Sequence, residues 1–305
     1  MNLRVPTILK LFWAAIKGWS KDDVPRLGAS LAYYTLFAIG PILVIAIAIA
    51  GMVYGPEAVR GQIVGEISGL IGRQGAEAVQ SILQSAHQSR TGFAVVIGTV
   101  TLLLGASGAF LELQHALNTL FRVKTDPKKS GLERLLLSRL RSFGMVVSIG
   151  FLLLVSLVVS AALAAVATRI QRSSLGWPVL LQAINMIVSL AVMTLLFGLI
   201  YRLLPDVRLA WRDVWIGAFV TSLLFSIGKF LIGLYLGHSG VASSYGAAGS
   251  IVVLLVWVYY SAQVLLLGAE FTRVYAERQR GGPPPPNHLA RPDPEKHPSA
   301  PKTTP

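Results

Sequence analysis

Long uninterrupted apolar runs dominate the pattern of hydrophobic and polar positions along this chain. A helix that crosses a bilayer needs about 20 mostly apolar residues. Six runs reach that length, and the pattern therefore predicts an all-α polytopic membrane protein, a bundle of six transmembrane helices. The six runs are Leu27–Tyr54, Thr91–Leu120, Ser142–Ala167, Trp177–Leu203, Trp211–Leu236 and Tyr245–Tyr275.

A shorter amphipathic pattern precedes the first run. From Pro6 to Trp19, Lys10 and Lys17 share one helical face, and apolar and aromatic residues occupy the remainder. This predicts a helix over about residues 6–19 that lies in the cytoplasmic membrane interface. The alternative, in which these residues simply begin the first span, is less favoured because charged residues and Pro25 interrupt the chain.

Two stretches outside the runs complete the predicted organisation. Gly55–Arg90 carries apolar residues at helical spacing, which predicts short amphipathic outer-loop helices that cap the outer face of the bundle. Residues 281–305 are rich in proline and have no apolar face to bury, which predicts a disordered cytoplasmic tail. A role of the proline run as a ligand for an SH3-like partner is the less favoured alternative. The membrane domain accordingly spans residues 1–280.

The composition agrees with a membrane protein and excludes several kinds of site. The chain of 305 residues is 53% hydrophobic and 13% charged, and its mean hydropathy is +0.62, unlike an ordinary soluble domain. It contains no cysteine, which excludes disulfides, thiolate metal sites and cysteine nucleophiles. No short apolar segment followed by a small-residue cleavage site is found near the N-terminus, so no cleaved signal peptide is predicted.

The distribution of basic residues predicts the orientation. Most of the 27 lysines and arginines lie before the first span, between spans two and three, between spans four and five, and after span six. Because such residues stay cytoplasmic, both termini are predicted to be cytoplasmic. This asymmetry, with attraction to anionic lipid headgroups, accounts for the net charge of +13. We therefore expect the lipid bilayer as a partner and no nucleic acid.

Polar residues within the spans are expected to face the interior of the bundle, because an unpaired polar group in lipid is costly. Gly40-Pro41 should kink the first span, which could serve as a hinge or merely improve packing. Gln114 and Asn118, four residues apart, form a pair on one helical face. The candidate polar pathway consists of Tyr33, Glu112, His115, Gln182, Asn185, Gln263 and Glu270.

Gln263 and Glu270 are seven residues apart and therefore share one face of the last span. Glu270 and Glu112 are expected at a similar depth near the cytoplasmic edge. Two carboxylates at that depth could form a proton or cation site. In the alternative, Glu270 pairs with Arg273, three residues further on, at the interface. The sequence leaves both alternatives open.

Two other features could bind a ligand. Lys229 lies in the outer half of the fifth span, where snorkelling of its side chain to the interface is favoured over contact with a substrate. The glycine-rich segment after that span contains Ser243 and Ser244, and its free amides could meet an anion if it lines a cavity. Glu112 and His115 have the spacing of a bundle metal motif but lack a matching second motif, so neither a metal nor a cofactor is predicted.

Four blocks together resemble the YihY/BrkB family of bacterial inner-membrane proteins. The resemblance implies a six-helix integral protein of the inner membrane, linked in places to serum resistance or envelope lipid biology. No catalytic role transfers with it. The blocks are "LGASLAYYTLFAIGPIL", "RLRSFGMVVSIGFLLLVSLV", "LLPDVRLAWRDVWIGAFVTSLLFSIGKF" and "SSYGAAGSIVVLLVWVYYSAQVLLLGAEFTRVYA". The resemblance marks Tyr33, Pro41, Pro205, Asp206, Tyr245, Gly246, Gly249, Gly268 and Glu270 as motif positions.

Many members of that family carry an old label as a tRNA-processing ribonuclease, which the residues of this chain do not support. A metal-dependent nuclease needs a cluster of carboxylates or histidines around its ions, and the predicted cytosolic acids here are scattered. We therefore expect no enzyme. The leading hypothesis is a transporter or a protein that handles envelope lipids or an amphipathic anion; the alternative is a non-transporting scaffold for envelope assembly. Homo-oligomerisation stays open.

Overall fold

The structure of the chain is a computed structural model that describes residues 5–38, 108–125, 177–238, 245, 249–287 and 290–294. Several predictions fall outside these ranges. They concern the third span, the outer loop, Gly40-Pro41, and Ser243 with Ser244.

Three long helices lie in the ranges predicted for the fourth, fifth and sixth spans. They are α6 (Trp177–Leu203), α7 (Trp211–His238) and α9 (Gly249–Arg280), and each is long and apolar enough to cross a membrane. Parts of the first two predicted spans are also helical, over residues 24–38 and 108–120. The described residues thus support a helical membrane protein, and the number of six spans stays a prediction.

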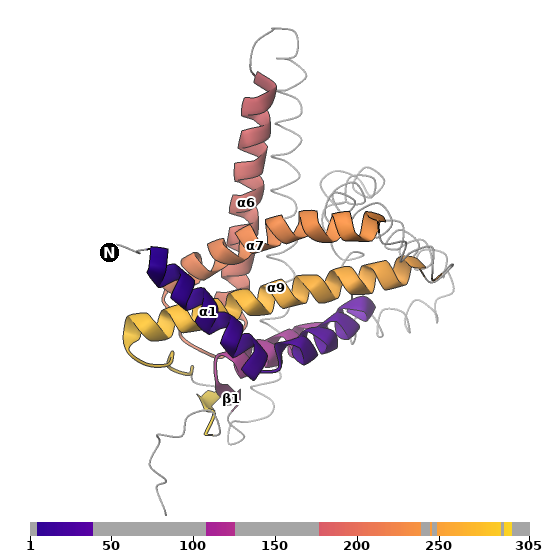
Figure 1. The fold of residues 1–305 in the computed structure, drawn as a ribbon. Coiled ribbons are helices and arrows are strands. Elements are labelled where there is room, and N and C mark those ends of the chain that lie inside the picture. The colour runs from indigo at the N-terminus through magenta and orange to yellow at the C-terminus, as the bar shows by residue number, and fades with distance from the viewer. Residues whose placement is uncertain are drawn as a thin grey trace, which may run out of the picture.

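The N-terminal helix α1 (Val5–Lys21) has the position that the amphipathic pattern predicts. It ends at a turn in which Asp23 has a positive φ of 54°, and a second helix follows over residues 24–38. Pro25 fits in the first turn of that helix, where no N–H donor is needed. The two helices are therefore separate elements, and α1 crosses α9 (Figure 1).

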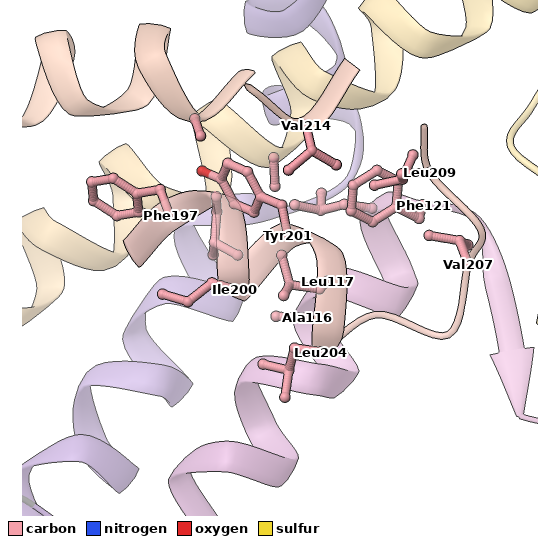
Figure 2. Packing of buried hydrophobic residues seen from close by; sticks show 14 of the residues in the cluster. Ala116, Leu117, Phe121, Phe197, Ile200, Tyr201, Leu204, Val207, Leu209 and Val214 are labelled. Carbon is pink, nitrogen blue, oxygen red and sulfur yellow. The ribbon is translucent and has the colours of Figure 1, made fainter. Parts of the chain in front are cut away.

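The core lies where α6, α7 and α9 meet residues 108–121. Tyr201 of α6 is fully buried there, close to Leu117 and Phe121 (Figure 2). Its hydroxyl donates to the carbonyl of Leu265 on α9 at 2.7 Å and lies 3.0 Å from Thr221 Oγ1 on α7. Interhelical hydroxyl contacts of this kind join helices without leaving a polar group unpaired in an apolar interior.

Glycines allow α7 and α9 to approach closely around these hydroxyls. A Cβ atom added at Gly268 of α9 would lie 1.9 Å from Thr221 Oγ1, and one added at Gly217 of α7 would lie 1.8 Å from Thr272 Oγ1. Both distances are far below van der Waals contact. The α7–α9 interface therefore requires small residues at these two positions.

Gly268→Ala is accordingly expected to lower the free energy of unfolding by about 1–3 kcal/mol, since an extra methyl group overpacks the interface. Thermal loss of far-ultraviolet circular dichroism of the purified protein in detergent would measure the effect. Gly233→Ala is the matched control, because a Cβ atom there meets nothing within 4 Å. Equal melting temperatures for the two variants would contradict the tight interface.

The segment after α9 corrects the prediction of a disordered tail from Gly281. Within it, β2 (Ala290–Pro292) pairs antiparallel with β1 (Val123–Thr125), and Pro286 forms a bridge with Val207. The N–H of Arg208 donates to the carbonyl of Pro285 at 2.9 Å. The prediction was wrong for these residues because an extended proline-rich segment can be held through its backbone and needs no apolar face. We call residues 281–287 and 290–294 the C-terminal strap; the rest of the tail lies outside the described residues.

Candidate functional site

One face of α9 carries polar groups that lie against the two N-terminal helices. A Cβ atom added at Gly18 of α1 would lie 1.8 Å from Glu270 Oε1, and one added at Gly28 would lie 2.0 Å from Gln263 Nε2. The predicted common face of Gln263 and Glu270 is thus covered by α1 and by the helix over residues 24–38. We call Gln263, Glu270 and Arg273, with the backbone around Gly18 and Gly28, the polar seam.

Glu270 and Arg273 form a buried ion pair at one end of the polar seam. Glu270 is 0% exposed and Arg273 is 3% exposed. Arg273 donates through Nε to Glu270 Oε2 at 3.0 Å and through Nη2 to Glu270 Oε1, and its Nη1 donates to Glu277 Oε1 at 2.6 Å. The pairing with Arg273 that the sequence offered as an alternative is confirmed. Both side chains are buried in the protein, so the pair is not exposed at the membrane interface.

Two further charged residues come from distant parts of the chain; Asp22 is buried, and Arg122 is partly exposed. Asp22 follows α1, and Arg122 follows the helix over residues 108–120; both are close enough to act electrostatically on Glu270. Arg122 has a positive φ of 59°, which ends the helix, and its buried Nε has no hydrogen-bond partner among the described residues. Acids and bases are thus balanced in a place where an uncompensated charge would be costly.

Gln263 lies at the other end of the polar seam and, unlike the ion pair, has no hydrogen-bond partner for its side chain among the described residues. Its amide nitrogen and oxygen are both buried, and neither has a hydrogen-bond partner in the part of the chain that the structure describes. The buried hydroxyl of Tyr275, also on α9, likewise has no hydrogen-bond partner among the described residues. An unpaired buried group of this kind costs about 1–3 kcal/mol. The face of α9 beneath the N-terminal helices therefore retains capacity for hydrogen bonds.

Three other predicted site residues, on the helices over residues 24–38 and 108–120, are not brought to the polar seam. Tyr33 is 58% exposed and makes edge-on ring contacts with Tyr34 and Phe37. Glu112 is partly exposed and His115 is exposed, and the carboxylate that acts on Glu270 is Asp22 instead of Glu112.

Three predicted residues lie on the long helices. Lys229 is partly exposed on α7, while Gln182 and Asn185 belong to α6. No three histidine, aspartate or glutamate side chains gather around a common point in the described ranges, so these ranges contain no candidate metal centre.

Asp206 is a structural centre that is not among the predicted pathway residues. It is 3% exposed, and its carboxylate accepts hydrogen bonds from Gln114 (3.2 Å), Asn118 (3.0 Å) and Asn287 (3.0 Å). Its own N–H donates to Asn118 Oδ1 at 2.7 Å. Two signals pointed to it, namely the amides of Gln114 and Asn118 on one helical face and the position of Asp206 in a motif.

Salt bridges join several elements at the end of the bundle where Asp206 lies. Arg280, at the end of α9, lies 3.6 Å from Asp213 in the first turn of α7 and donates to the carbonyl of Arg208 at 3.0 Å. Lys124 of β1 lies 3.1 Å from Asp293 of the C-terminal strap. The start of α7 and the end of α9 therefore meet at one end of the bundle.

Comparison with known proteins relates most of the chain to one group. A family model described as "Virulence factor BrkB" matches residues 15–293. A UPF0761 membrane protein of Ralstonia nicotianae is 27% identical over 269 residues, which cover 87% of this chain and 58% of that protein. Similar proteins occur in Pseudoalteromonas atlantica (27% identity, 83% of this chain and 82% of that protein) and Neisseria meningitidis serogroup B (25%, 85% and 62%). No solved structure matches the chain.

Proposed function

Because the chain belongs to the BrkB family of membrane proteins, we propose that it moves or handles an envelope lipid or another amphipathic anion across the bacterial inner membrane, and that it is not an enzyme. The observation that carries the proposal is the buried amide of Gln263, which has no partner among the described residues and shares a helix face with the Glu270–Arg273 pair. A polar group that passes along this face would supply the missing hydrogen bonds.

The packing on the opposite side of α9 supports the polar seam as the route. There, Thr272 Oγ1 donates to the carbonyl of Gly268 at 2.7 Å, Thr221 Oγ1 donates to the carbonyl of Gly217 at 2.7 Å, and Tyr201 joins all three long helices. Those hydroxyls are paired, and the packing around them admits no added atom. Motion of the N-terminal helices relative to α9 would leave that interface intact while opening the polar seam.

A donor atom beside the polar seam supports an anionic substrate. Arg122 Nε is buried without a hydrogen-bond partner in the described part of the chain, and guanidinium groups bind phosphate and carboxylate oxygens well. The excess of lysine and arginine in the segments predicted to be cytoplasmic would draw an anion to the same end. We propose the inner membrane as the location, with both termini in the cytoplasm.

Thiol labelling tests whether the polar seam opens to water, and the absence of native cysteine makes single-cysteine variants clean. We expect the cysteine of Gln263→Cys to react with a membrane-impermeant reagent in intact cells or in inside-out vesicles. The matched control is Ala269→Cys, which is fully buried away from the two glycines and should stay unreactive. The exposed Ser20, replaced by cysteine, reports that the reagent reaches the protein.

Transport of a probe completes the test. In liposomes, the protein should move fluorescent phosphatidylglycerol or an alkyl phosphate between leaflets, and Gln263→Leu should slow this at least about tenfold if the amide contributes one hydrogen bond of about 1.4 kcal/mol in the transition state. Gly233→Ala should leave the rate unchanged. An inert Gln263→Cys variant together with zero movement of both probes would overturn the proposal in favour of a non-transporting scaffold for envelope assembly.

A further inference from the structure

Helix α1 has two apolar faces, and the described residues cover one of them. Leu11 and Ala15 are buried against Phe271 and Tyr275 of α9. On the other side, Leu9 is 61% exposed, Trp13 is 66% exposed and Ile16 is 36% exposed. These three residues follow each other at spacings of four and three, so they form one continuous stripe.

Basic residues flank that exposed stripe. Lys10, Lys17 and Lys21 are exposed, and α1 contains no acidic residue between Val5 and Lys21. Trp13 lies three residues after Lys10 and four before Lys17, so both ammonium groups can reach the surface on which its ring lies. The nearest acids in sequence are at the far end, where Asp22 is buried and Asp23 is exposed in the turn.

The position of α1 along α9 indicates its depth in the bilayer. Its contacts with Glu270, Phe271 and Tyr275 lie in the last third of α9. The start of α7 meets the end of α9 at this level, and there Trp211 and Trp215 stack on one another while both remain exposed. Exposed tryptophans mark the boundary between hydrocarbon and headgroups. Helix α1 therefore lies near that boundary, at the charged end of the span.

We propose that the exposed face of α1 binds the headgroups of anionic phospholipids. In this arrangement Leu9, Trp13 and Ile16 enter the upper acyl region, while Lys10 and Lys17 contact phosphate oxygens. Anionic lipids fit this face better than neutral lipids because lysines flank the apolar stripe and α1 contains no acidic residue. The proposal does not depend on transport.

Lipid binding at this face has a consequence for the polar seam. Gly18 lies on the same helix as the lysines, and its backbone rests directly on the carboxylate of Glu270. A lipid that holds α1 at the membrane surface therefore also sets how firmly α1 covers Glu270. Anionic lipid is expected to stabilise the covered state by mass action.

Fluorescence quenching of the full chain in nanodiscs tests the proposal. The discs contain phosphatidylcholine and phosphatidylglycerol, with brominated acyl chains on one lipid at a time, and the difference between the native protein and Trp13→Phe isolates the signal of Trp13. Brominated phosphatidylglycerol should quench Trp13 more strongly than brominated phosphatidylcholine. Each removed lysine should lower this preference about fivefold at low salt, since one lysine near an anionic surface contributes about 1 kcal/mol. The variants are Lys10→Gln and Lys17→Gln.

Matched controls keep the result interpretable. Arg291→Gln, which removes an exposed basic residue of β2, should leave the preference unchanged, and circular dichroism should show that each variant is folded. Equal quenching by the two lipids would overturn the proposal, because the face would then enter the bilayer without selecting charge. No quenching by either lipid would also overturn it, since another protein surface, such as a second copy of the chain, would cover the stripe.

Discussion

Glu270→Ala should lower the free energy of unfolding by about 3–5 kcal/mol, because it leaves the guanidinium of Arg273 buried without its main partner. Both side chains are almost fully buried, and two of the three Arg273 nitrogens donate to Glu270. Chemical denaturation of the purified protein in mixed micelles, followed by circular dichroism, would measure the loss. Removal of both charges, as in Glu270→Leu with Arg273→Met, should recover most of the stability.

Glu277→Ala is the matched control for this prediction. Glu277 accepts a hydrogen bond from the same arginine, but its side chain is 26% exposed, so its loss should cost at most about 1 kcal/mol. If the Glu270 and Glu277 variants unfold alike, the buried pair is not a structural requirement.

A double-mutant cycle locates the carboxylate against α1. A Cβ atom at Gly18 would clash with Glu270 Oε1, so Gly18→Ala should be destabilising in the native protein and much better tolerated when Glu270 is alanine. Additive effects of the two substitutions would contradict the contact, since only neighbouring residues couple.

Asp206→Ala is expected to have the second large effect, because three side chains from two other segments donate to its carboxylate. Hydrogen bonds to a charged group contribute about 1.5–3 kcal/mol each, and Gln114, Asn118 and Asn287 would all lose theirs. We expect a lower melting temperature and release of the C-terminal strap. Hydrogen exchange at the amides of β2 and cleavage by protease after Gly281 would both report that release.

Lys124→Ala separates the role of Asp206 from a general loosening of the C-terminal strap. Its side chain is 44% exposed in the pair with Asp293, so removing the pair should cost at most about 1 kcal/mol. Unchanged protease resistance in Asp206→Ala would show that the β1–β2 pairing holds the C-terminal strap alone, and would contradict the central role of Asp206.

The sequence predicts α6, α7 and α9 to within a few residues at most ends because long apolar runs depend only on local composition. The start of α9 at Gly249 and its end at Arg280 differ most from the predicted 245–275. The helix ends later than predicted because charged residues continue it beyond the apolar part. The C-terminal strap was missed for a different reason. Its pairing with residues 123–125 joins segments that are far apart in sequence, and no local pattern contains that information.

The candidate site was predictable to a similar extent. Helical periodicity places Gln263 and Glu270 on one face, and the three-residue spacing offers Arg273 as a partner. The approach of Gly18 and Gly28 to that face, and the arrival of Asp22 and Arg122 near Glu270, depend on how separate helices pack. A single sequence contains no signal for such contacts.

The polar seam also bears on how the protein is made. Its two sides, the helices that carry Gly18 and Gly28 and the helix α9 that carries Gln263 and Glu270, are separated by most of the length of the chain. A ribosome therefore delivers the N-terminal helices to the membrane long before their partner exists. The surfaces around Gly18 and Gly28 therefore stay without their partner until α9 is inserted. Packing of α9 against them then buries the polar groups of Gln263 and Glu270 in one step. Assembly of the polar seam is thus completed only when α9 is inserted, and a chain that stalls before Gly249 should be recognised by membrane quality control as unfinished.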